Sequence, residues 1–211
     1  MKKFDPTLYF VTNSTGRSEE EFLRIVDAAC EAGVTIVQLR EKERGGREYL
    51  HLAQVTKKVT DKYNIPLIID DRVDVALACD CAGVHVGQSD LPVEVARKIL
   101  GPAKIVGATA KTVTPAREAY EQGADYIGCG AIYPTKTKVI TVLTPVERLT
   151  DICKAVPIPV NAIGGLNKDN IDVLKHSGIA GICVVSNIME AKDPAQVTRE
   201  LKAAVKKIIA S

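Results

Sequence analysis

The sequence is poor in aromatic residues and contains no tryptophan: aromatic side chains make up 4% of its 211 residues. Its charges nearly cancel, with 28 Lys and Arg against 26 Asp and Glu and a formal net charge of +2. Proteins that bind nucleic acids use a basic surface or aromatic stacking platforms. The composition therefore predicts no nucleic acid partner.

Long apolar runs and paired cysteine motifs are also missing. No stretch reaches the ~18 apolar residues of a membrane-spanning helix, and the charged N-terminus, Met1–Pro6, is not followed by the ~7–15 apolar residues of a secretory signal. The six cysteines include no C-x-x-C motif, and only Cys79 and Cys81 are close in sequence. We expect a cytoplasmic protein without membrane association, whose cysteines are small buried residues.

Apolar runs that are typical of strands alternate with amphipathic segments along the whole chain. After the first run, Ser18 is the expected N-cap of a helix, with Glu21 three residues on. Strands are expected near 8–12, 34–39, 67–70, 83–87, 104–109, 125–129, 158–163 and 180–185, and the helices after the first are expected near 47–62, 72–79, 92–100, 114–122, 146–155, 168–176 and 193–209.

Eight such units predict an α/β protein with a parallel sheet that closes into a (β/α)8 TIM barrel, a single compact domain of residues 1–211. The alternative is an open doubly wound sheet, but the turn at Thr12–Gly16 lacks the G-x-G-x-x-G pattern. Glycines precede the even strands, where we expect each to end a helix in the left-handed conformation: Gly33, Gly83, Gly123 and Gly178.

In a β/α barrel the active site is built from the loops that follow the strands. After the second strand, alternation places Gln38, Arg40 and Lys42 on one side of the chain, and the two cations suit a polyphosphate. The alternative is a solvated surface loop, of which Glu41, Lys42, Glu43 and Arg44 are also typical. Asp70-Asp71 follow the third strand and Asp90 follows the fourth.

The carboxylates of Asp71 and Asp90 could converge on Mg²⁺, which prefers one or two carboxylates plus phosphate oxygens. The alternative role for each is as the N-cap of the next helix, with Pro92 near one first turn.

The later loops carry phosphate-binding chemistry. The long loop at 130–138 contains Thr135, Thr137 and Lys138, and is either a phosphate clamp or a surface loop without a role. Gly164-Gly165 lead through Asn167 into an expected helix, whose start would favour an oxyanion. Val185-Ser186 close the eighth strand, at a place where many barrels hold a phosphate.

The three histidines have simple interpretations. His51 and His176 are expected on the surface of helices, and His85, in a strand, is expected to be a hydrogen-bonded core residue. The sixth strand has no lysine, which argues against Schiff-base chemistry there.

Four segments in register resemble the thiamine-phosphate synthase family. They are Gln38–Lys42, Gly83–Gln88 followed by Asp90, Tyr126–Thr135 followed by Thr137-Lys138, and Ala162–Gly165, and the similarity extends over essentially the whole chain. It implies a transferase that joins hydroxymethylpyrimidine diphosphate to thiazole phosphate and releases pyrophosphate, with small-molecule partners only. The sequence leaves the oligomeric state open, a homo-oligomer included.

The resemblance also implies roles for individual residues. Gln38 would contact the pyrimidine. Arg40, Lys42, Asp70, Thr109 and Lys138 would lie at the diphosphate, with Asp71 and Asp90 as Mg²⁺ ligands. The thiazole phosphate would be surrounded by Thr135, Thr137, Gly165, Val185 and Ser186.

The chain departs from the family pattern at three places. Asp70 stands where Asn is common, Thr109 replaces a serine and is followed by Lys111 where a His is frequent, and the segment after Lys138 lacks the usual Gly-Leu pair. Two rivals share this fold: a thiazole tautomerase, which would not need the diphosphate and metal residues, and a non-catalytic sensor of phosphorylated ligands.

Lys138 allows a first test. Because it is expected on a loop and at a leaving diphosphate, Lys138→Ala should lower turnover far more than stability. Steady-state kinetics and thermal unfolding of the purified variant measure the two effects. Equal losses of both would contradict the assigned role.

Overall fold

The computed structural model describes residues 4–135 and 142–211. Within these ranges, the strands are β1 (Leu8–Val11), β2 (Ile36–Leu39), β3 (Leu67–Asp70), β4 (Gly83–Val86), β5 (Ile105–Thr109), β6 (Tyr126–Gly130), β7 (Val160–Ile163) and β8 (Gly181–Val184). The helices are α1 (Glu19–Ala32), α2 (Gly46–Lys62), α3 (Val73–Ala78), α4 (Val93–Leu100), α5 (Val113–Glu121), α6 (Val146–Ala155), the 3-10 helix η1 (Ile171–Leu174), α7 (Ser186–Met189) and α8 (Pro194–Ile209).

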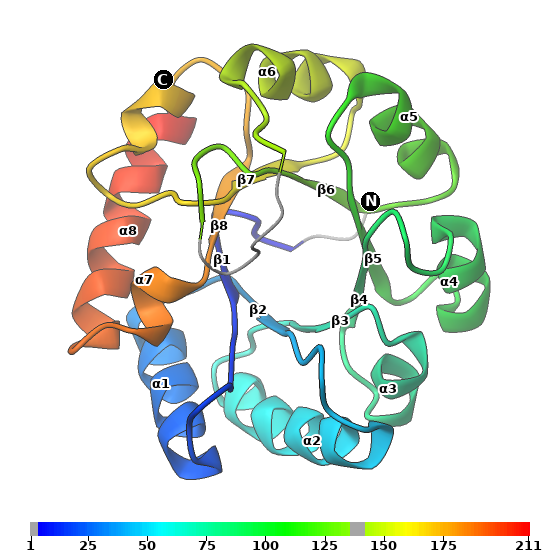
Figure 1. The fold of residues 1–211 in the computed structure, drawn as a ribbon, viewed down its shortest axis with the longest axis vertical. Helices are drawn as coiled ribbons and strands as arrows, with labels where there is room; N and C mark the ends of the chain where they lie inside the picture. The colour runs from blue at the N-terminus through cyan, green and yellow to red at the C-terminus, as the bar shows by residue number, and fades with distance from the viewer. Residues whose placement is uncertain (1–3, 136–141) are drawn as a thin grey trace.

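The strands form a closed parallel barrel in chain order, and the helices surround it (Figure 1). Closure occurs at β1, which pairs with β2 through Tyr9 and Ile36 and with β8 through Tyr9 and Cys183. The predicted (β/α)8 barrel is thus confirmed, and the open sheet is excluded. Since all the strands are parallel, their C-terminal ends share one mouth.

Alternation along each strand divides the core into two layers. One set of side chains, which includes Leu8 and Phe10, points outward against the helices. The other set, which includes Tyr9 and Val11, points into the barrel. The same parity turns Gln38 and Thr109 inward on their strands. The inner layer contains two tyrosines, Tyr9 and Tyr126, so the interior is not purely aliphatic.

The predicted helix ends are confirmed in part. Ser18 caps α1 by accepting the Glu21 backbone N–H, and Gly33, Gly123 and Gly178 have the expected positive φ of 105°, 96° and 81°. The prediction for Gly83 is wrong, because this residue begins β4 with ordinary strand geometry. It is glycine because a Cβ there would overlap the Ile105 carbonyl oxygen of β5.

The prediction of a helix near 168–176 is also wrong. Only the short η1 forms there, and His176 lies beyond it with φ 63°. Asparagine side chains take the backbone donors that would begin a helix: Asn170 accepts the Asn167 N–H at 2.8 Å, and Asn167 accepts the Asp169 N–H at 2.9 Å. Such local bonds compete with helix formation.

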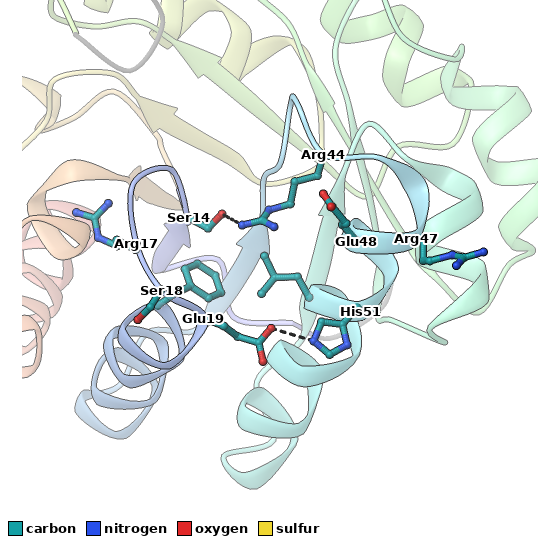
Figure 2. A pocket seen from close by; sticks show the side chains of 10 residues that line it. Ser14, Arg17, Ser18, Glu19, Arg44, Arg47, Glu48 and His51 are labelled. Carbon is teal, nitrogen blue, oxygen red and sulfur yellow. Dashed lines mark hydrogen bonds and ion pairs between the residues drawn. The ribbon is translucent and has the colours of Figure 1, made fainter.

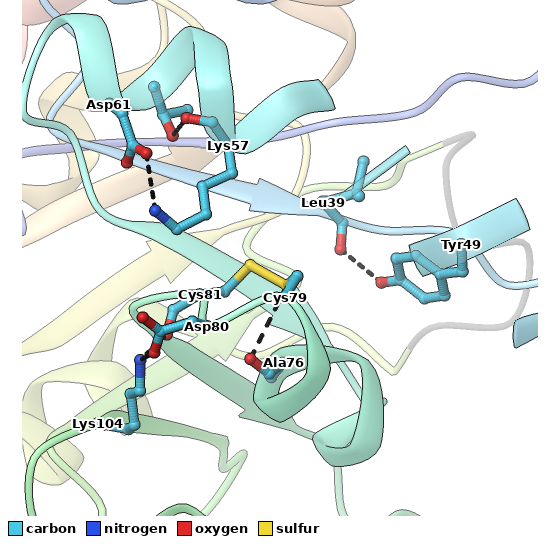
Figure 3. The surroundings of a disulfide bond; sticks show 10 residues. Leu39, Tyr49, Lys57, Asp61, Ala76, Cys79, Asp80, Cys81 and Lys104 are labelled. Atoms are coloured by element: carbon cyan, nitrogen blue, oxygen red, sulfur yellow. Dashed lines mark hydrogen bonds and ion pairs between the residues drawn. A yellow bond between two sulfur atoms is a disulfide. The ribbon is translucent and has the colours of Figure 1, made fainter. Parts of the chain in front are cut away.

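One pair of cysteines is buried, as expected, but is not reduced. Cys79 and Cys81 form a disulfide beside the end of α3 (Figure 3). The cause is local: α3 ends at Ala78 and Asp80 adopts a left-handed φ of 50°, which brings the two Cα atoms to 5.4 Å, within disulfide range. Cys30, Cys129 and Cys183 are buried thiols, as expected, whereas Cys153 is only half-buried.

No helix in residues 4–135 and 142–211 has the length and apolar character needed to cross a membrane.

Gly107 allows a test of the inner layer. A Cβ at this position of β5 would overlap the Tyr126 ring, whereas Gly45 has open space and an ordinary φ of −63°. We expect Gly107→Ala to lower the free energy of unfolding by about 1–3 kcal/mol through overpacking. Gly45→Ala, the control, should cost less than about 1 kcal/mol. Urea unfolding followed by circular dichroism compares them; equal effects would contradict the packing account.

Candidate active site

The polar residues that follow the strands meet in one cavity at the C-terminal mouth of the barrel, with a volume of about 650 Å³. Every predicted site residue that the structure describes lines it: Gln38, Arg40, Lys42, Asp70, Asp71, Asp90, Thr109, Thr135, Gly165, Val185 and Ser186. The predictions for Thr137 and Lys138 concern residues outside the described ranges.

Cations and carboxylates are in direct contact on the β2–β3 side of this cavity. Lys42 Nζ lies 3.0 Å from Asp70 Oδ2 and also contacts Asp71, while Arg40 Nε lies 3.6 Å from the same Asp70 oxygen. Burial alone would lower the pKa of Lys42, but the Asp70 and Asp71 carboxylates raise it above its ordinary value. The ammonium group therefore stays charged beside the two aspartates.

The second carboxylate pair is Asp71 and Asp90, and neither caps a helix. The N-caps of α3 and α4 are Arg72 and Pro92, without side-chain cap bonds. Asp71 has a left-handed φ of 59° and donates its N–H to the His85 carbonyl at 2.8 Å. Asp90 instead accepts the Gly87 N–H at 2.8 Å, within its own loop.

The Asp71 carboxyl has a raised pKa. Burial and then the Asp70 charge raise its pKa from 3.8 to about 6, with a further contribution from the Asp90 side chain, and contact with Lys42 opposes the rise. A carboxyl in this state binds a proton or a cation more readily than an isolated surface aspartate does.

His85 is hydrogen-bonded, as predicted, but it also lines the cavity, which the sequence reasoning missed. Its Nδ1 lies 3.1 Å from the Tyr126 hydroxyl and its Nε2 lies 2.9 Å from Thr109 Oγ1. Burial lowers the pKa of His85, so a neutral imidazole is favoured. The inward parity of β4 is the sequence signal that could have found it.

Gln38 is turned toward the inner layer by one bond. Its Nε2 donates to the Tyr9 hydroxyl at 2.8 Å, and its side chain is almost fully buried. Gln38 and Thr109 thus both line the cavity from strands, and each is hydrogen-bonded to an inward side chain, Tyr9 for Gln38 and His85 for Thr109.

The opposite side of the cavity is formed by close backbone. Gly164 and Gly165 have φ of 103° and 63°, and a Cβ on Gly165 would lie 2.7 Å from the Pro134 carbonyl oxygen. Only glycine allows the loop after β7 to lie this close to the loop after β6. The expected helix start at Asn167 is absent, so the oxyanion chemistry predicted there would depend on loop amides and on Ser186, the first residue of α7.

Two further residues differ from the sequence interpretation. Lys111 lines the cavity, which the sequence did not predict, and its Nζ donates to the Val142 carbonyl at 3.4 Å. Glu41, interpreted as loop surface, has a side chain only 6% exposed, because Ser14 and Arg44 donate to its Oε2 at 2.8 and 2.9 Å.

A second cavity of about 480 Å³ lies between the N-terminal ends of α1 and α2 (Figure 2). Its polar groups bond to one another: Arg44 Nη2 donates to Ser14 Oγ at 3.1 Å, and His51 Nε2 lies 2.9 Å from Glu19. His51 is exposed on α2, as predicted. The charges that line this cavity are therefore largely engaged with their neighbours.

Asp71 predicts a pH dependence of stability. Because its folded-state pKa of about 6 is above the ordinary 3.8, the contribution to stability is present below pH ~4 and is lost as the pH rises through ~6. Asp71→Asn removes this titration, so its stability relative to the wild type should increase over that window. Thermal unfolding at several pH values, without divalent cations, measures the difference. A difference that does not change with pH would contradict the prediction.

Comparison with known proteins shows the family to which the chain belongs. A protein-family model described as thiamine monophosphate synthase matches residues 8–188. Thiamine-phosphate synthase 2 of Streptococcus pneumoniae serotype 4 is 56% identical over 186 residues, which cover 88% of this chain and 89% of the relative. The thiamine-phosphate synthase of Lacticaseibacillus paracasei is 47% identical over 209 residues, covering 99% and 98% of the two chains.

A solved structure is similar as well. The thiamine phosphate pyrophosphorylase of Pyrococcus furiosus superimposes with a TM-score of 0.87 at 37% identity, over 97% of this chain and 98% of that one. With the family match spanning most of the barrel and relatives of this similarity over nearly the full length, the chain belongs to the thiamine-phosphate synthase family.

Proposed function

We propose that this chain joins 4-amino-2-methyl-5-hydroxymethylpyrimidine diphosphate to 4-methyl-5-hydroxyethylthiazole phosphate, giving thiamine phosphate and pyrophosphate. One observation carries the proposal: cations, paired carboxylates and a glycine-lined loop share a single cavity at the barrel mouth. Such a cavity suits two anionic ligands, one beside the cations and one beside the loops after β6, β7 and β8.

The diphosphate would lie beside Arg40, Lys42 and Thr109. Both cations form ion pairs with Asp70. This ion pairing supports a role for Asp70 as a counter-ion that holds the two cations, and it offsets the extra negative charge that Asp brings in place of the family's usual Asn. Lys138, from the loop beyond the described residues, would add a third cation.

The donor set fits magnesium. The Asp90 side chain contributes to the raised pKa of Asp71, so the two carboxyl groups are neighbours. Among the described residues no group of three or more His, Cys, Asp or Glu could hold a metal ion, so this pair would need oxygen ligands from the substrate and water. Mg²⁺ commonly uses one or two carboxylates and takes its other oxygens from substrate phosphates and water. Asp71 and Asp90 would hold it, and it would neutralise charge on the departing pyrophosphate.

The thiazole phosphate would lie on the opposite side. Thr135 and Ser186 bring hydroxyl groups to the cavity, and Gly165 and Val185 line the same side, where main-chain amides would bind phosphate oxygens. Thr137 would complete this set from outside the described residues.

The bond changes balance without a general base. The bond between the pyrimidine methylene carbon and the diphosphate oxygen breaks, and its electron pair leaves with pyrophosphate. The lone pair of the thiazole nitrogen then forms the new C–N bond, so no proton has to be removed. Arg40, Lys42 and Thr109 would stabilise the leaving charge, and the cavity would align the two rings.

The test is pyrophosphate release by purified protein with both substrates and Mg²⁺, together with chromatography of the product. We expect turnover that is lost without Mg²⁺ and that falls by roughly 100-fold or more in Asp71→Asn and Asp90→Asn, since several kcal/mol of charge stabilisation would be removed. Asp61→Asn, an exposed aspartate at the end of α2, is the charge-matched control and should stay within about twofold.

Other outcomes would contradict the proposal in distinct ways. Binding of both substrates without pyrophosphate release would indicate a sensor. Isomerisation of a thiazole phosphate without any use of the diphosphate would indicate a tautomerase.

A further inference from the structure

A continuous chain of hydrogen bonds crosses the barrel interior beneath the cavity. Gln38 Nε2 lies 2.8 Å from the Tyr9 hydroxyl, which lies 2.7 Å from the Tyr126 hydroxyl. The Tyr126 hydroxyl lies 3.1 Å from His85 Nδ1, and His85 Nε2 lies 2.9 Å from Thr109 Oγ1. The five residues come from five strands, and the chain begins and ends at side chains that line the cavity.

The interior is shaped to hold these rings. A Cβ at Gly107 would overlap the Tyr126 ring, and one at Gly128 would lie 3.2 Å from His85 Cε1. Tyr126 also packs edge-on against Tyr9, at a ring separation of 5.7 Å. Because Tyr9 and Tyr126 are at most 1% exposed, water does not compete for their hydroxyl groups.

The donor and acceptor chemistry of the five side chains determines which group donates in each hydrogen bond of this series. An amide nitrogen only donates, so Tyr9 accepts from Gln38 and its own proton is free for Tyr126. Tyr126 can then donate to His85 Nδ1. A neutral imidazole that accepts at one nitrogen donates at the other, so Nε2–H points to Thr109 Oγ1. Thr109, having accepted this bond, keeps its own O–H proton for a ligand.

We propose that Tyr9, Tyr126 and His85 are positioning residues that couple the orientation of the Gln38 amide to that of the Thr109 hydroxyl. Gln38 then presents its carbonyl oxygen to the cavity, where it accepts from an N–H donor on a ring, and Thr109 donates to an anionic oxygen. The identity of these ligands, an aminopyrimidine and its diphosphate, rests on the proposed function; the direction of the chain does not.

Specificity follows from the direction. If a ring carried an acceptor in place of its amino group, that acceptor and the Gln38 carbonyl oxygen would face each other and could not form a hydrogen bond. The Gln38 amide could not easily rotate to present its N–H instead, because it is bonded to the buried tyrosines. Reversing the amide would require every proton in the chain to shift, placing the His85 proton on Nδ1 and using the Thr109 proton for His85.

The first experiment reads this proton directly in the ligand-free protein. The chain has three histidines, and both His51 and His176 are exposed, so the double variant His51→Gln/His176→Gln leaves His85 as the single imidazole. Long-range ¹H–¹⁵N NMR then distinguishes the two tautomers. We expect a protonated Nε2 and an unprotonated Nδ1. A proton on Nδ1 would overturn the proposal, and neither result depends on turnover.

The second experiment interrupts the series of hydrogen bonds at its centre. Tyr126→Phe keeps the ring but removes the hydroxyl, so the His85 nitrogens should lose their single tautomer. The KM for the pyrimidine diphosphate should rise about 10-fold, the scale of one hydrogen bond to a charged or well-placed group, while the KM for the thiazole phosphate should not change.

Tyr49→Phe is the matched control for the NMR signals. Tyr49 is equally buried, but its hydroxyl donates to the Leu39 and Asp70 carbonyls outside the chain, at 2.7 and 3.1 Å. The His85 signals should be unchanged in this variant. Unchanged His85 signals in Tyr126→Phe, or equal rises of both KM values, would overturn the positioning role.

Discussion

The pairing of β1 with β8 is the constraint on which the rest of this structure depends. It closes the sheet, so strands far apart in the chain become neighbours and their C-terminal ends surround one mouth. Residues separated by about 150 positions, such as Gln38 and Ser186, thereby line the same cavity. Closure also creates a dry interior, and inward side chains must satisfy one another there.

Opposite charges of the protein are paired at the mouth of the barrel. Asp70 contacts both Arg40 and Lys42, and Lys42 also contacts Asp71. Each cation is thus held beside a counter-ion, whose attraction offsets part of the cost of its partial burial. Burial and then the neighbouring Asp70 charge raise the pKa of Asp71, so its charged form is disfavoured despite this balance. A cation beside Asp71 would favour the charged carboxylate.

Inside the barrel, the tyrosines and the histidine are tolerated because their polar atoms find partners. The hydroxyls of Tyr9 and Tyr126 and both nitrogens of His85 are hydrogen-bonded, and Gly107 and Gly128 supply the space that the rings need. An aliphatic filling would cost less to bury but would leave Gln38 and Thr109 free to rotate. The interior can therefore connect two sides of the cavity, whereas most barrel cores only fill space.

The sequence by itself determined the eight units, the barrel and the placement of Gln38 and Arg40 on one side of the chain, because these follow from local periodicity. It did not predict the loss of the helix after β7, where the Asn167 and Asn170 side chains take the backbone donors, or the true role of Gly83, which depends on Ile105 of the next strand. The partners of His85 were decided only by the tertiary structure, because Tyr126 and Thr109 come from other strands that closure brings together. Periodicity specifies which way a side chain points; only the closed barrel specifies what it meets there.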